Sequence, residues 1–256
     1  MCDERFEEIS SHGCVLAIEA VSQAVLLDFS TDDFGTPLVN GQDISTPPEF
    51  GNFVAITDDA GGNPNHLGAA IFNSDPAGPN SGGPDFDLLV NLGNILILQS
   101  TVSPTQTTAG IFDVPNDSVV GGTVFFNFPY YNPAEMESLD LIDINGNMAS
   151  IVTLWDGGGL SRTYSVPSEW TKDVFVSGPD GYDTLDLTTL APQLGEGGST
   201  ATAVEDAGFD PTDVWTMSVQ LIGSGALDNV QFIPEPATLT LLGLGGASLL
   251  RRRRHV

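Results

Sequence analysis

The feature that most constrains the fold is a long series of short apolar runs separated by turn-forming residues. Between residues 25 and 233, runs of about four to eight residues alternate with Gly, Pro, Asn and Asp. Such runs are shorter than ordinary helices and are typical of strands in all-β proteins. The pattern therefore predicts an all-β domain over residues 25–233, a β-sandwich with jelly-roll-like topology.

Most of this region is expected to form strands, and helical signals are scarce. The expected strands are, in chain order, 25–29, 52–56, 69–72, 94–99, 122–128, 138–144, 149–155, 162–166, 173–176, 184–187, 215–222 and 226–233. Single helical turns are expected at 133–136 and 203–207. No long amphipathic stretch competes with the strands.

The last two expected strands have the clearest pattern. Met217, Val219 and Leu221 alternate with polar residues, which places these three side chains on one face of a strand. The sequence Gly223-Ser224-Gly225 then predicts a tight turn and a hairpin. In the second strand a bulge near residues 228–229 would reconcile the spacing of the apolar residues.

The charge of the chain is strongly acidic and excludes one class of partner. The sequence has 34 Asp and Glu against 7 Lys and Arg, a net charge of -27. Residues 28–233 contain 28 acidic side chains and two basic ones, Arg162 and Lys172. Such a surface repels phosphate backbones, so nucleic-acid binding is not expected. The 14 Phe residues and the strand-like runs favour a folded core over acidic disorder.

The C-terminal segment, residues 234–256, has three parts. Pro234-Glu235-Pro236 precedes an uncharged stretch of 14 residues, 237–250, and a run of arginines follows from Arg251 to Arg254. As a helix the stretch would be about 21 Å long, shorter than a usual membrane span of about 20 residues. The arginines would stay on the cytoplasmic side. A hydrophobic helix that spans the membrane is therefore expected, and the alternative is a buried core helix with a basic tail.

This three-part end resembles the PEP-CTERM sorting signal of bacteria that produce exopolysaccharide. The resemblance implies processing near the motif by an exosortase-type membrane protease and delivery to the cell envelope or the extracellular space. It makes these residues a substrate signal, with transient inner-membrane anchoring before processing. The residues that match the signal are Pro234, Glu235 and Pro236, the span glycines Gly243, Gly245 and Gly246, and the tail Arg251, Arg252, Arg253 and Arg254.

Residues 1–24 are expected to be a leader or a degenerate signal segment. The stretch 14–24 is mostly apolar and ends in Ser22-Gln23-Ala24, which resembles a cleavage site, but an acidic segment precedes it where a signal peptide is basic. The alternative is a short amphipathic leader helix. Since the C-terminal signal requires export, the true start codon is expected to lie elsewhere. Both cysteines, Cys2 and Cys14, lie in this segment, so no disulfide is expected after its removal.

The domain at residues 25–233 also resembles the jelly-roll, carbohydrate-binding-module-like domains of exported bacterial proteins. The resemblance rests on the segments 27–29, 85–88, 93–97 and 226–232. It implies a sandwich with a structural calcium ion and contact with glycans. It does not imply catalysis.

Two sets of carboxylates are candidates for calcium ligands. Asp75, Asp85 and Asp87 lie in one Gly-rich and Pro-rich loop, and hard cations prefer several oxygen ligands brought together by such loops. Asp28 and Asp228 would meet if the first and last strands are neighbours. The alternatives are a solvated acidic loop for the first set and a plain bulge at Asp228 for the second.

A few aromatic and polar residues are candidates for sugar contact or catalysis. Tyr130 and Tyr131 lie in a Pro-flanked loop and are the expected ligand-binding pair. His66 is the single histidine of residues 25–233, and no Gly-x-Ser-x-Gly elbow accompanies it, so it is expected to be polar surface. In a chain this acidic, a carboxylate pair for glycoside hydrolysis can be found by chance.

These observations favour a non-catalytic, exported envelope or extracellular matrix protein. Its expected partners are an exosortase-type membrane protease and exopolysaccharide. Two alternatives stay open at this point, a calcium-supported carbohydrate-binding module and a polysaccharide hydrolase.

Overall fold

The computed structural model describes residues 23–45, 50–51, 54–130, 133–144, 149–171 and 181–235. The segment Gln23–Glu235 forms one compact unit that is built almost entirely of antiparallel strands. Within the described ranges, the single helical element is a 3-10 turn, η1 at Phe86–Leu88, and no helix is long and apolar enough to cross a membrane. The hydrophobic helix expected at 237–250 lies outside these ranges.

The thirteen strands follow one another along the whole unit. They are β1 (Val25–Leu27), β2 (Ala55–Asp58), β3 (His66–Asn73), β4 (Asn94–Ser100), β5 (Gly122–Asn127), β6 (Ala134–Ile142), β7 (Ser150–Asp156), β8 (Ser161–Val166), β9 (Tyr182–Asp186), β10 (Gln193–Leu194), β11 (Thr200–Glu205), β12 (Val214–Leu221) and β13 (Ala226–Pro234).

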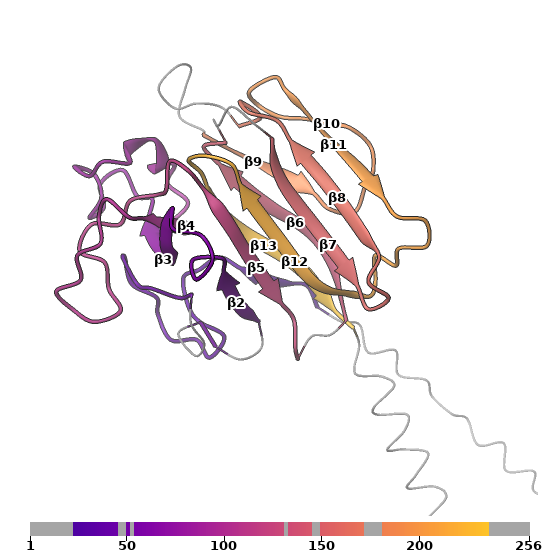
Figure 1. Cartoon of the computed structure of the whole chain (residues 1–256), viewed down its shortest axis with the longest axis horizontal. Coiled ribbons are helices and arrows are strands. Elements are labelled where there is room, and N and C mark those ends of the chain that lie inside the picture. The colour runs from indigo at the N-terminus through magenta and orange to yellow at the C-terminus, as the bar shows by residue number, and fades with distance from the viewer. Residues whose placement is uncertain are drawn as a thin grey trace, which may run out of the picture. The chain divides into compact units, whose positions relative to one another are not determined.

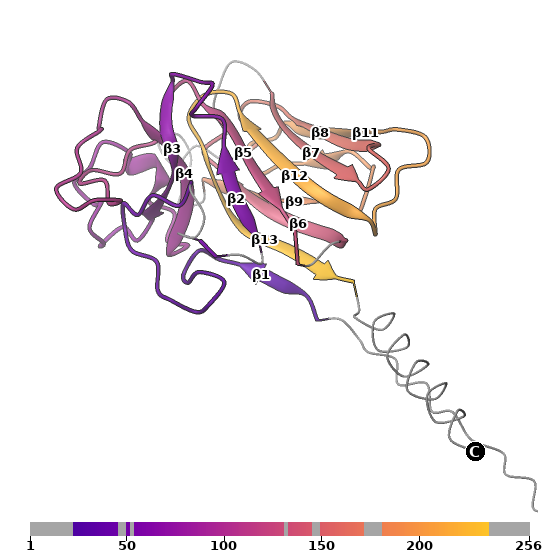
Figure 2. The same cartoon turned by 60° about the horizontal axis from the view of Figure 1, so that its bottom comes forward.

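The strands form two layers, as a sandwich-like fold requires. The first layer has the order β2-β5-β12-β7-β8-β11-β10, and the second has the order β9-β6-β13-β4-β3 with β1 also paired to β13. One register pair, between Val214 and Ala134, joins the layers into a continuous hydrogen-bonded path. Figure 1 looks onto the first layer, with β9 and β6 behind it, and Figure 2 brings β1 and β13 forward.

The larger core lies between the layers, where alternate residues of most strands point inward, and β3 and β4 are buried on both faces because a second, smaller hydrophobic cluster packs on their other side. Strands β5, β7 and β8 show this period of two in their burial, and Phe126, Leu154 and Tyr164 are among the inward residues. Val230 and Phe232 of β13 meet them from the second layer and are fully buried. Full burial of one such side chain is worth about 1.5–3 kcal/mol, so this shared core is the main source of stability.

The predicted hairpin between the last two strands is wrong, although the predicted bulge is confirmed. Both edges of β12 are occupied, by β5 and by β7, so β13 pairs instead with β6, β4 and β1. Gly223-Ser224-Gly225 therefore carries the chain from the first layer to the second. In β13 the register shifts after Asp228, and Asn229 has a φ of 49°.

Both predicted helical turns are also wrong. Residues 134–136 begin β6, and residues 203–205 belong to β11, which the sequence analysis missed together with β10. Pairing with β8 brings Ala201 of β11 onto the core, and this tertiary contact outweighs the weak helical preference of an Ala-rich segment. The expected strand at 173–176 lies outside the described residues.

Candidate functional site

The first candidate site is a set of three carboxylates where β1, β6 and β13 meet, called here the junction carboxylates: Asp28, Asp140 and Asp228. Asp228 of β13 is the register partner of Asp140 on β6. On the other edge of β13, Leu27 of β1 pairs with Val230, which brings the next residue, Asp28, beside the bulge. The neighbouring strands on which the predicted Asp28–Asp228 pair depends are thus present, and Asp140 joins the pair.

Asp228 differs from the other two junction carboxylates because it is buried without a hydrogen-bond partner. Its side chain is 1% exposed, and neither of its carboxylate oxygens has a hydrogen-bond partner. Burial, together with the negative charges of Asp140 and Asp28, raises the pKa of Asp228 to about 8. A buried carboxyl without partners must hold a proton at neutral pH or be neutralised by a cation.

The other two junction carboxylates do have hydrogen-bond partners. Asp140 accepts from the Thr184 hydroxyl at 2.5 Å and from the Asn229 amide at 2.8 Å. Asp28 accepts from the backbone N–H and the hydroxyl of Ser30. These contacts hold two carboxylates in place beside the unpartnered carboxyl of Asp228.

The second candidate site is the set of corner carboxylates, Asp85, Asp87 and Asp117, next to the crossing between the layers. Asp85 Oδ2 accepts the backbone N–H of Asp117 at 2.6 Å. Asp117 Oδ2 accepts the Ser224 hydroxyl at 2.5 Å and the Gly225 N–H at 2.8 Å. Burial and then the charge of Asp117 raise the pKa of Asp85 to about 8, and burial also raises the pKa of Asp117. The two carboxyls titrate as one unit.

Of the three carboxylates predicted as calcium ligands in this loop, the structure brings two together and leaves the third apart. Asp85 and Asp87 lie near Asp117, which was not predicted, whereas the exposed Asp75 accepts the Ala77 N–H within its own loop. No group of three or more His, Cys, Asp or Glu side chains in the described part of the chain is arranged to hold a metal ion. Calcium binding at either set of carboxylates therefore stays a prediction.

The expected sugar-binding tyrosines are only half described. Tyr130 is 68% exposed at the end of the loop after β5, as a stacking residue would be. Tyr131 lies outside the described residues. Contact with sugar at this loop stays a prediction.

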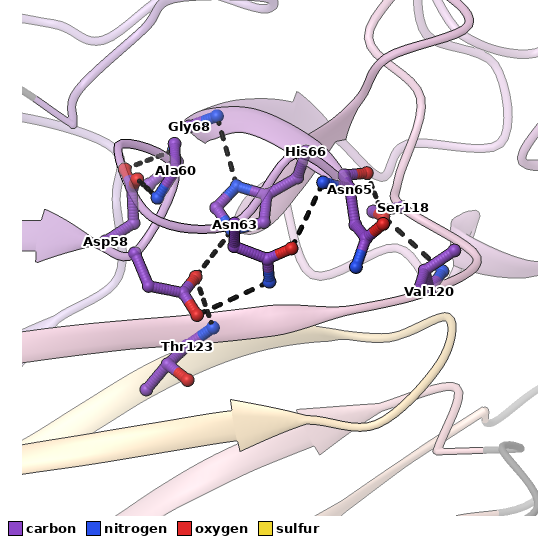
Figure 3. Close-up of polar contacts among 11 residues, drawn as sticks. Asp58, Ala60, Asn63, Asn65, His66, Gly68, Ser118, Val120 and Thr123 are labelled. Carbon is purple, nitrogen blue, oxygen red and sulfur yellow. Dashed lines mark hydrogen bonds and ion pairs between the residues drawn. The ribbon is translucent and has the colours of Figure 1, made fainter.

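His66 was expected on the surface, and this is wrong: it is 3% exposed at the start of β3. Figure 3 shows the ring next to Gly68 and above Thr123. Its Nδ1 accepts the Gly68 N–H at 3.2 Å, so its Nε2 carries the proton and donates to Asp59 Oδ1 at 2.6 Å. Burial opposes ionisation of Asp59, but the Thr123 N–H and His66 outweigh it and lower the pKa of Asp59.

We expect Gly122→Ala to disrupt this histidine contact and destabilise the protein by about 2 kcal/mol. A Cβ at residue 122 would lie 2.4 Å from His66 Nε2 and 2.9 Å from Asp59 Oδ1. The matched control is Gly82→Ala, because a Cβ at residue 82 meets nothing within 4 Å. Urea unfolding measures both variants, and equal stabilities would contradict this packing.

The third candidate site is the start of the Pro-Glu-Pro motif, which belongs to the folded sheet. Pro234 is the last residue of β13 and the register partner of Ala134. The exposed Glu235 still donates its backbone N–H to the Pro133 carbonyl at 3.1 Å. Pro236 and Arg251, Arg252, Arg253 and Arg254 lie outside the described residues.

Comparison with known proteins identifies this third site. Residues 232–254 match the model of the PEP-CTERM protein-sorting motif. A search of curated proteins finds no match to the chain.

The fold and its end define an all-β, sandwich-like protein with a C-terminal sorting signal. The PEP-CTERM motif indicates that the chain is sorted by exosortase, a membrane protein, to the cell exterior. The match covers only the end of the chain, so it assigns no family to residues 23–231.

Proposed function

We propose that this chain is a non-catalytic protein of the cell envelope or extracellular matrix, processed by exosortase and associated with exopolysaccharide. The observation that carries the proposal is the PEP-CTERM motif, which continues directly from a central strand of a folded domain. Residues 237–250 would hold the chain transiently in the inner membrane before processing. The folded domain would then be the part delivered outside.

The surroundings of His66 support a role without catalysis. It is the single histidine in the described ranges, and each of its ring nitrogens already has a hydrogen-bond partner in the protein. A catalytic histidine needs a nitrogen that faces the nucleophile or the substrate. The His66–Asp59 pair instead fixes the start of β3 against β5.

We expect motif variants to block sorting. In a host that has an exosortase, the double variant Glu235→Gln/Pro236→Ala should accumulate unprocessed in the cell fraction, while the wild type reaches the envelope or the medium. The matched control is Glu196→Gln, which removes the same charge from another exposed position. Fractionation with immunoblotting measures both. Normal processing of the double variant would contradict the sorting role of the motif.

A second candidate is a calcium-supported carbohydrate-binding module with jelly-roll topology, favoured by the unpartnered Asp228 and the exposed Tyr130. Because the described residues hold no group of three carboxylates already arranged for a metal, Asp28, Asp140 and Asp228 would have to move closer together to hold calcium, with main-chain carbonyls and water completing the six to eight oxygen ligands that it prefers. When bound, it would neutralise the buried charge and tie the first and last strands together.

A polysaccharide hydrolase has less support. A pocket of about 170 Å³ beside β1 is lined in part by Asp28, Asp32 and Asp33. Asp32 accepts the N–H groups of Phe34 and Thr36, and Asp33 accepts the Val54 N–H. Asp32 and Asp33 thus accept hydrogen bonds from the backbone, and the pocket offers no specific reason to assign hydrolysis.

A further inference from the structure

Within the described strands, the outward positions of the first layer carry no charged side chain, in a chain that is otherwise strongly acidic. Within the described bounds of β2, β5, β12, β7, β8 and β11, the residues that point away from the core are Ala, Ser, Thr, Asn, Gln, Val, Ile, Phe and Trp. We call this surface the neutral face. Its central row crosses all six strands and consists of Thr57, Phe125, Ser218, Thr153, Thr163 and Val204.

Register and side-chain contacts show that these residues share one face. Thr153 and Thr163 are register partners on β7 and β8, and their hydroxyl oxygens are 3.4 Å apart. In the neighbouring row, the Thr216 hydroxyl donates to Asn127 Oδ1 at 3.1 Å. Trp155 is the register partner of Thr216 on the other edge. Figure 1 looks onto these strands from the outside.

The acidic residues within these strands are the last residues of β2, β7 and β11, and their oxygens bond to other parts of the protein. Asp156 accepts the Leu160 N–H within the β7–β8 turn, and Glu205 pairs with the buried Arg162. At the rim, just after β11, Asp206 accepts both the N–H and the hydroxyl of Ser161. Residues 28–233 hold 28 acidic side chains, so their absence from the outward positions of these six described strands marks this face as different from the rest of the surface.

We propose that the neutral face binds an uncharged polysaccharide chain. Hydroxyl and amide groups at regular strand spacing offer hydrogen bonds to a polyhydroxyl ligand, and Phe125 and Trp155 add aromatic surface. Cationic partners would be drawn to the acidic remainder of the protein, and anionic ones would be repelled from it. The inference names a partner for the exported protein and so rests on the proposed function, but it needs neither calcium nor Tyr130.

The size of the neutral face favours this occupant over a second copy of the chain. Six strands about 4.8 Å apart and about 20 Å long cover on the order of 500 Å². A stable dimer buries about 800 Å² on each partner and has a more apolar core. An extended chain that runs across the strands fits a surface of this size and polarity.

The test is retention of the purified full chain on microcrystalline cellulose and on curdlan, both neutral and insoluble, with alginate gel as the anionic comparison. EDTA is present throughout, so that calcium plays no part. We expect retention on at least one neutral polysaccharide and none on alginate. Thr163→Asp should bind at least about tenfold more weakly, because it places an unpaired charge under the ligand. The matched control Ser81→Asp adds the same charge on an exposed loop and should bind as the wild type does.

Circular dichroism shows whether each variant is folded, and Thr153→Asp repeats the test at a second position of the row. Absence of binding to both neutral polysaccharides would overturn the proposal, as would equal binding by wild type and folded Thr163→Asp. Light scattering identifies the other occupant: a dimer that Thr163→Asp dissociates would show that the face binds a second copy. Because the assay uses purified protein, a failure of sorting leaves its result unchanged.

Discussion

Asp228→Asn is expected to stabilise the calcium-free protein at pH 7 and to remove its response to calcium. The carboxyl is 1% exposed without a hydrogen-bond partner, and its pKa is raised from 3.8 to about 8. At pH 7 the unfolded chain therefore releases a proton that the folded chain retains. Each pKa unit is worth about 1.4 kcal/mol, and pH 7 lies about three units above the unfolded pKa, so this difference costs about 4 kcal/mol, which a neutral amide avoids.

The sign of the pH dependence follows from the same raised pKa. Below about pH 4 the Asp228 carboxyl is protonated in both states and costs nothing. Between about pH 4 and pH 8 the unfolded chain binds fewer protons than the folded chain, so the free energy of unfolding falls as pH rises. Urea unfolding in EDTA across this range should show a shallower fall for Asp228→Asn. An identical slope in the variant would contradict the raised pKa.

Calcium should narrow the difference in stability between the two proteins. If calcium binds the junction carboxylates, a roughly hundredfold excess over its Kd stabilises the wild type by about 2.7 kcal/mol, and Asp228→Asn gains little. The matched control Asp75→Asn changes an exposed loop carboxylate and should respond as the wild type does. Equal stabilisation of Asp228→Asn would place the ion elsewhere. No shift in the wild type would mean that the junction holds a proton and no calcium.

Arg162→Met is expected to destabilise the protein by about 1–3 kcal/mol, because it removes a buried guanidinium that pairs with the exposed Glu205 and donates to the Leu187 carbonyl. Arg162 is 6% exposed, and its Nε and Nη2 donate to Glu205 Oε2 at 2.8 and 2.5 Å. Its Nη1 donates to the Leu187 carbonyl, and its guanidinium lies 5.1 Å from the centre of the Phe209 ring. Met fills much of the same volume but leaves the Glu205 carboxylate without its charged partner.

A double variant separates the ion pair from the packing. Arg162→Met/Glu205→Gln removes both charges and should recover part of the stability that the single variant loses. Thermal unfolding at pH 7 compares the stability of the wild type, of the single variants Arg162→Met and Glu205→Gln, and of the double variant. A loss below about 1 kcal/mol in Arg162→Met would place this pair in the class of exposed surface pairs, against the burial of Arg162 in the structure.

Sequence patterns predicted the strands better than their pairing. Met217, Val219 and Leu221 point inward as their alternation indicates, because alternation depends only on local backbone geometry. The partners of β12 depend on β5 and β7, which are distant in sequence, and the Gly-Ser-Gly segment carries no signal that distinguishes a hairpin from a crossing between layers. The local sequence therefore predicts the strand, whereas tertiary packing determines which strands it pairs with.

The same limit applies to the candidate sites. Asp28 and Asp228 were expected to meet because they lie on the first and last expected strands, and the pairing of β1 with β13 makes these strands neighbours. Asp140 and Asp117 were missed because only strand register and the crossing between layers bring them near the other carboxylates. His66 was assigned to the surface because the contact with Asp59 that makes its burial favourable is a tertiary one.

The central claim is that exosortase sorts this protein through its C-terminal motif. The most direct test is the intact mass, with C-terminal peptide sequencing, of the protein recovered from the envelope or medium of a host that has an exosortase. We predict a chain outside the cytoplasm that ends near Pro234-Glu235-Pro236 and lacks Arg251–Arg254. A cytoplasmic chain that retains its four arginines would contradict the account.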